Sequence, residues 1–88
     1  MILTLSNSDY IFFCEYADDP FRGFKVGKSG KMITLDYTPG DRDAWYPFEE
    51  AYDEAYLEHA PKPEYEPDNI GLRLERISDD LVDQSYKN

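Results

Sequence analysis

The sequence predicts an α+β fold, with a small, mainly antiparallel sheet of about four to five strands and one acidic amphipathic helix packed on it. Over residues 1–40, short segments rich in β-branched and aromatic residues alternate with turn signals. Apolar residues then recur with a helical period over about residues 48–60. The chain of 88 residues has the length of one domain, so we expect residues 1–88 to form a single domain.

Four segments of the N-terminal half are predicted as strands. Ile2–Leu5 is short and apolar, and Tyr10–Tyr16 is rich in β-formers on both faces, which indicates a central strand. An Asp-Asp-Pro run is expected to end this second strand. Phe21–Val26 and Lys31–Tyr37 then read as a hairpin, joined by a turn at residues 27–30 that contains two glycines.

An amphipathic helix is predicted over about residues 48–60. Pro47 marks its start, because proline suits the first position of a helix. The apolar residues lie three and four positions apart and form one stripe, while the opposite face is acidic. The stripe consists of Phe48, Ala51, Tyr52, Ala55 and Tyr56, with His59 at its end.

The C-terminal part begins with a connector over residues 61–67, which we expect to be extended because it holds three prolines. The residues that follow fit two patterns. Strict alternation of apolar and polar residues favours a strand, whereas apolar residues three and four apart fit one face of a helix. The strand is preferred, over residues 69–77, with a short C-terminal helix capped by Ser78 after it.

Negative charge is concentrated in the middle of the chain. The net charge is −10, and residues 41–68 hold ten acids against only two bases. Such charge bears on partners and solubility rather than on the fold. Because acidic proteins are repelled by nucleic acid phosphates and by anionic lipids, we expect no direct nucleic acid binding and no membrane association. The expected partner is a protein with a basic surface.

Motifs that carry catalysis or cofactor binding are incomplete in this sequence. The Gly-Lys-Ser run at residues 27–29 lacks the spacing of a phosphate-binding loop. Asp41 and the acid two residues later lack the further ligands of a calcium loop, so Asp41 is expected to close a turn or cap the helical region. Cys14 and His59 are single copies, whereas zinc takes about four ligands. We expect no enzyme, no cofactor and no metal site, and a buried, inert Cys14 thiol.

The acidic face of the predicted helix is the candidate binding surface. Residues four apart on a helix lie about 6 Å apart, so Glu50, Glu54 and Glu58 form one row of charge, and Glu49 and Asp53 form another. This spacing is close to that of phosphates along a nucleic acid strand. Each like-charge pair at i,i+4 destabilises a helix by about 0.2–0.5 kcal/mol, which favours a surface selected for binding. The alternative is a solvated face that serves solubility alone.

Apolar and aromatic residues flank this charge, as in the hot spots of protein interfaces. Leu57 lies near the centre of the acidic face, whereas Trp45 is expected to pack under the helix. The predicted partner-binding residues are Asp43, Tyr46, Glu49, Glu50, Asp53, Glu54, Leu57, Glu58, Glu64, Tyr65 and Glu66.

In general character, this small, acidic and tyrosine-rich chain is similar to phage-encoded inhibitors that imitate DNA, including anti-CRISPR and anti-restriction proteins. The resemblance is one of type and carries no residue over. It implies that the acidic face occupies the basic nucleic-acid-binding groove of a nuclease or CRISPR-type complex, and excludes the substrate sterically and electrostatically.

Two other classes stay open. An immunity or antitoxin protein would use the same charge complementarity against one cationic toxin, such as a nuclease. A non-enzymatic interaction module, for example a homodimer formed through a sheet edge or the tyrosines, would keep its contacts at high salt.

The expected location is the cytoplasm, of a bacterial host if a phage encodes the chain. A single cysteine forms no internal disulfide, which fits a reducing compartment. The N-terminal residues have no basic region before a long apolar run, so we expect no signal peptide. No apolar run approaches the roughly 20 residues that cross a bilayer.

Overall fold

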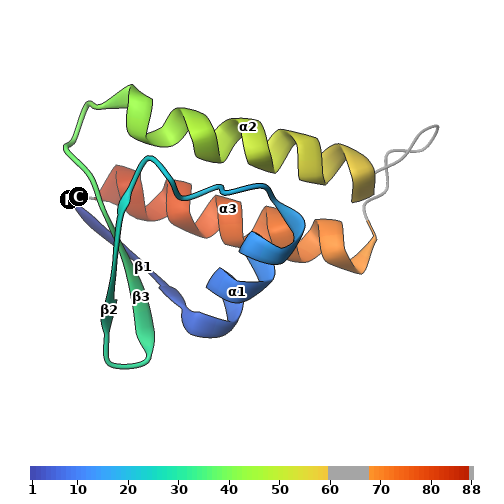
Figure 1. Cartoon of the computed structure of the whole chain (residues 1–88), viewed down its shortest axis with the longest axis horizontal. Coiled ribbons are helices and arrows are strands. Elements are labelled where there is room, and N and C mark those ends of the chain that lie inside the picture. The colour runs from blue at the N-terminus through green and yellow to red at the C-terminus, as the bar shows by residue number, and fades with distance from the viewer. Residues whose placement is uncertain (60–67, 88) are drawn as a thin grey trace.

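The computed structural model describes residues 1–59 and 68–87 of the chain. Within this part, three strands and three helices follow one another in the order β1, α1, β2, β3, α2 and α3 (Figure 1). The α+β class is confirmed, but the antiparallel sheet has three strands instead of four to five. The elements are β1 Ile2–Ser6, α1 Asn7–Tyr16, β2 Lys25–Ser29, β3 Met32–Asp36, α2 Arg42–His59 and α3 Asn69–Lys87.

The sheet has the order β1-β3-β2, so β3 is central and the other two strands are edges. In β1 and β3 the registers Leu3 to Leu35 and Leu5 to Ile33 place four apolar side chains on one face. All four are buried, because the helices cover this face. By contrast, all five residues of β2 are exposed, and the hairpin of β2 and β3 projects beyond the helices (Figure 1).

The predicted hairpin is confirmed, with a shift of its first strand. β2 begins at Lys25, so most of the predicted strand Phe21–Val26 is a loop that contributes Phe21 and Phe24 to the core. The predicted turn at residues 27–30 is wrong, since Gly27 pairs with Thr34 inside the ladder. The turn is the two-residue loop after Ser29, where Gly30 has φ +61°. A two-residue hairpin loop of the II′ type requires this conformation at its first residue, which glycine adopts without strain.

The prediction of a strand over Tyr10–Tyr16 is wrong, because these residues form most of α1. Ser6 starts the helix directly after β1, and its side-chain oxygen accepts a hydrogen bond from the Asp9 backbone N–H at 3.0 Å. This cap satisfies one of the free donors of the first turn. Phe13 is fully buried in the core, so tertiary packing overrides the β-propensity of the segment.

The prediction of a strand over residues 69–77 is also wrong, and the alternative helical pattern is correct. α3 is one continuous helix, and its buried side chains Leu74, Ile77 and Leu81 follow the three-and-four spacing. The predicted cap Ser78 is instead a buried residue in the middle of the helix. The cap is Asp68, whose carboxylate accepts a hydrogen bond from the Gly71 N–H at 2.8 Å.

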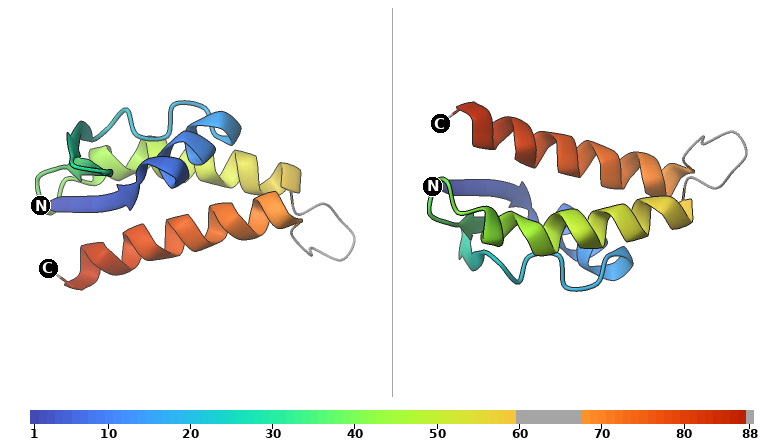
Figure 2. Two further views of the ribbon diagram at one scale, coloured as in Figure 1. Left: turned by 90° about the horizontal axis from the view of Figure 1, so that it is seen from below. Right: turned by 90° about the horizontal axis from the view of Figure 1, so that it is seen from above.

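The predicted acidic helix is confirmed and begins earlier than expected. Pro47 lies inside α2 instead of at its first position. α2 begins at Arg42 because Asp41 caps the start of the helix, as predicted. The Asp41 carboxylate accepts a hydrogen bond from the Asp43 N–H at 3.1 Å. The apolar stripe also extends backwards to Ala44, which is buried. α2 and α3 run antiparallel side by side, as both views of Figure 2 and their contacts show.

Aromatic and ionic contacts hold the helices in place around this core. Phe13, Phe21 and Phe48 pack with ring centroids 5.2–5.8 Å apart, which joins α1, the loop before β2 and α2. Asp9 of α1 accepts from Arg73 and Arg76 of α3 at 3.1 and 3.0 Å. These contacts fix the two long helices relative to each other, so the residues on their outer faces have defined positions. None of the described helices combines the length and apolarity of a membrane span.

Candidate protein-binding surface

The predicted binding residues of α2 all lie on its solvent-facing side. Tyr46 and Leu57 are 64% and 68% exposed, although both are large and apolar. The acids Asp43, Glu49, Glu50, Asp53, Glu54 and Glu58 are exposed as well. Predicted residues Glu64, Tyr65 and Glu66 lie outside the described part of the chain.

The acids of α2 form no internal ion pair within residues 1–59 and 68–87. The carboxylates that do pair with bases there lie outside α2, namely Asp9, Asp36, Asp68 and Asp83. Because none of the α2 acids is ion-paired in the described residues and all are exposed, their charge acts outwards into solvent.

The two rows of charge on α2 face different neighbours. Glu50 and Glu54 line a shallow hollow together with Arg22 of the loop before β2. Glu49 and Asp53 lie on the flank towards α3: Glu49 shares a groove with α3 residues, and the charge of Asp53 acts on Tyr52 beside Glu75 of α3. One row is therefore part of a surface formed by both helices.

α3 adds acids to this second row. Burial, together with the charges of Glu75, Asp79 and Asp53, raises the pKa of Tyr52 to about 12. In addition, Tyr56 of α2 donates a hydrogen bond to Glu75 at 3.2 Å. Carboxylates of two helices thus act electrostatically on Tyr52. Sequence reasoning missed the two α3 acids because it assigned part of α3 to a strand; the signal was the helical spacing of the neighbouring leucines and isoleucines.

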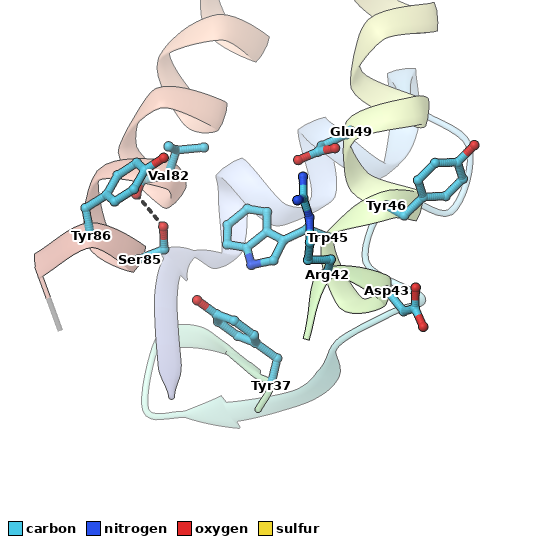
Figure 3. A pocket seen from close by; sticks show the side chains of 9 residues that line it. All are labelled: Tyr37, Arg42, Asp43, Trp45, Tyr46, Glu49, Val82, Ser85 and Tyr86. Carbon is cyan, nitrogen blue, oxygen red and sulfur yellow. Dashed lines mark hydrogen bonds between the residues drawn. The ribbon is translucent and has the colours of Figure 1, made fainter. Parts of the chain in front are cut away.

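A groove of about 320 Å³ lies at one end of the helix pair, where the start of α2 passes the end of α3 (Figure 3). Trp45 is half-buried in it and packs edge-to-face with Phe24, Tyr37 and Phe48, at centroid distances of 5.1, 5.6 and 5.7 Å. This confirms that Trp45 packs under the helix. The groove is lined by Tyr37, Arg42, Asp43, Trp45, Tyr46, Glu49, Val82, Ser85 and Tyr86.

The single cysteine and the single histidine have different neighbours. The prediction that Cys14 is buried is wrong, since its position on a helix instead of a central strand leaves it exposed. Partial burial nevertheless raises the pKa of the thiol, which lowers its thiolate fraction at neutral pH. His59 contacts the carboxylate of Asp68 at 2.8 Å. In the described residues, no three potential ligands come close enough to hold a metal ion.

Comparison of the chain with protein-family models, with curated proteins and with solved structures finds no match.

Proposed function

We propose that the protein is an acidic decoy that binds the basic, nucleic-acid-binding surface of another protein. One observation carries this proposal: the acids of α2 are exposed and without an ion pair in the described part of the chain, while the opposite face of the helix is buried. From Phe48 to His59 the helix thus presents a fixed array of acids with no Lys or Arg among them. The partner in this proposal is a nuclease or a CRISPR-type complex, and the effect of binding is exclusion of its nucleic acid.

The rigidity of α2 supports this proposal. Phe48, Ala51 and Ala55 are buried, so the backbone that carries the acids is fixed in the core before any partner arrives. A preorganised surface avoids much of the ordering cost of binding. Its charge also steers a basic partner towards it and speeds association.

The arrangement of charge also favours binding over plain solubility. Glu50, Glu54 and Glu58 repel one another along one flank, at a cost of about 0.2–0.5 kcal/mol for each adjacent pair. A surface that serves only solubility mixes both signs, which removes this cost. Glu75 and Asp79 of α3 act on Tyr52 together with Asp53, so they add to the negative charge of this flank instead of balancing it.

The test is a capture experiment from bacterial lysate with two matched variants. The wild-type protein is immobilised beside Glu50→Lys/Glu54→Lys, and beside Glu15→Lys/Asp83→Lys, which changes the net charge equally at exposed positions outside α2. Bound proteins are eluted with rising salt and then with competing DNA, and are identified by mass spectrometry.

The proposal expects a nucleic-acid-binding protein on the wild-type and Glu15/Asp83 columns, released by DNA, and absent from the Glu50/Glu54 column. Equal capture by all three columns, or capture that DNA does not reverse, would show that the acidic face does not bind a nucleic-acid-binding surface.

A further inference from the structure

The groove between α2 and α3 differs from the rest of the acidic surface because its walls are aromatic. Trp45 forms its floor, held by three ring contacts, and Val82 and Tyr86 of α3 form one side. Tyr86 is 84% exposed, so its ring is open to a ligand. The volume of about 320 Å³ is at the small end of ligand pockets and suits one long side chain.

Charged groups at the groove point to the chemistry of its occupant. Glu49 lines it, and Figure 3 shows the guanidinium group of the protein's own Arg42 directed towards Glu49 beside Trp45. The two side chains do not reach ion-pair distance, since no such pair joins them in the described residues. Arg42 also makes no cation–π contact with Trp45 in the described residues. The indole ring and the Glu49 carboxylate are thus both unpaired with a cation there, and each attracts a planar cation. The same protein places Arg73 over the Phe12 ring at 4.1 Å.

We propose that this groove binds an arginine side chain of the partner. The guanidinium group stacks between Trp45 and Tyr86 and pairs with the Glu49 carboxylate. Arginine is the preferred cation because its flat guanidinium group stacks on aromatic rings and is less strongly hydrated than an ammonium group. The inference rests on the proposed function, since it names the side chain by which a basic partner is anchored. Arg42 lies at the same place and would compete with the incoming arginine.

The probe is a hexa-arginine peptide, with a hexa-citrulline peptide of equal length as the neutral control. Trp45 is the single tryptophan of the chain, so its fluorescence reports on the groove alone. Binding is measured in parallel by calorimetry, which detects the peptide anywhere on the surface. The proposal expects a saturable change in Trp45 emission with hexa-arginine and none with hexa-citrulline.

Four single variants, one of them a control, make the test specific. Tyr86→Ala and Glu49→Gln, both at exposed positions where the fold does not depend on the side chain, should each weaken binding about fivefold. Arg42→Ala should tighten binding about threefold, because it removes the competing cation. Lys28→Ala makes the same change in net charge as Arg42→Ala, at an exposed position near the hairpin loop, and should leave the affinity within about 1.5-fold of wild type.

The proposal is overturned if calorimetry shows binding while Trp45 emission and the Tyr86→Ala affinity are unchanged. That result places the peptide elsewhere on the acidic surface and leaves the proposed function intact. No binding by either method, or equal binding of hexa-citrulline, also overturns it. Failure of the proposed function is detected separately, by the Glu50/Glu54 column in the capture experiment.

Discussion

The side-chain amide of Gln84 pairs with both backbone groups of Thr4. The Thr4 N–H donates to Gln84 Oε1 at 2.9 Å, and Gln84 Nε2 donates to the Thr4 carbonyl oxygen at 2.8 Å. Thr4 lies in the middle of β1, an edge strand whose outer groups would otherwise be open to pairing with another chain. α3 thus covers this edge of the sheet with a side chain that occupies the place of a neighbouring strand.

Replacement of Gln84 by leucine should therefore destabilise the protein. The two hydrogen bonds to Thr4 are lost, together with one from Gln84 Nε2 to Asp80 at 3.0 Å. Because the site is exposed and water replaces part of them, we expect a decrease of about 0.5–1.5 kcal/mol in the free energy of unfolding. The measurement is urea denaturation followed by circular dichroism. Asp83→Ala, at a neighbouring exposed position on α3, is the control. An unchanged free energy for Gln84→Leu would mean that the pairing with Thr4 contributes nothing.

Gly23→Ala should be strongly destabilising. A Cβ atom at this position would lie 2.2 Å from the backbone oxygen of Ala44, in the first turn of α2. Because neither backbone can move without disturbing the core, we expect a loss of about 3 kcal/mol or more. Gly30→Ala is the informative comparison: its Cβ would meet no neighbour, and the cost of about 1–2 kcal/mol arises from its positive φ alone. Equal costs for both variants would contradict the proposed clash.

Asp9→Asn should lower the free energy of unfolding at neutral pH. It should also make this free energy less sensitive to a fall in pH. Burial raises the pKa of the Asp9 carboxyl group, but the hydrogen bonds and charges of Arg76 and Arg73 outweigh this effect and lower it below the ordinary 3.8. A group whose pKa is lower in the folded state stabilises above its unfolded pKa, and this contribution is lost as the pH falls through the folded pKa.

We therefore expect Asp9→Asn to cost about 1–2 kcal/mol at pH 7, and the difference from wild type to shrink below about pH 4. The cap of α1 is retained, because it uses the backbone N–H of this residue. Urea denaturation between pH 7 and pH 3 measures both effects. A difference that stays constant over this range would show that the ionised carboxylate is not the stabilising species.

Glu54→Lys should increase stability and weaken partner binding at the same time. The change converts the repulsions of Glu54 with Glu50 and Glu58 into two attractions at i,i+4, which is worth about 1 kcal/mol in total. Glu15→Lys makes the same change in net charge on α1 and should alter stability by less than about 0.5 kcal/mol. Thermal denaturation and affinity for the captured partner are the two readouts. A stabilised variant that binds as tightly as wild type would show that this flank only faces solvent.

The amino-acid sequence by itself determined α2 and its acidic face. Its apolar residues repeat over several turns, and a long periodic pattern identifies both the helix and its buried side without knowledge of the neighbours. The hairpin around Gly30 was also visible, because glycine at a turn is a local requirement. In both cases the physical cause lies within a few residues of the chain. The exact start of α2 was not visible, since Pro47 is compatible with more than one position near the start of a helix.

Only the tertiary structure decided the state of Tyr10–Tyr16 and of residues 69–77. Both segments hold apolar residues that fit a strand or a helix, and the choice depends on which of them, such as Phe13 and Leu74, the core can bury. Only the tertiary structure also decided which side chains distant in sequence contact one another. Gln84 reaches Thr4 and the α3 acids reach Tyr52 only once α3 is helical and packed beside β1 and α2. Contacts between residues distant in sequence arise from packing, which no local pattern encodes.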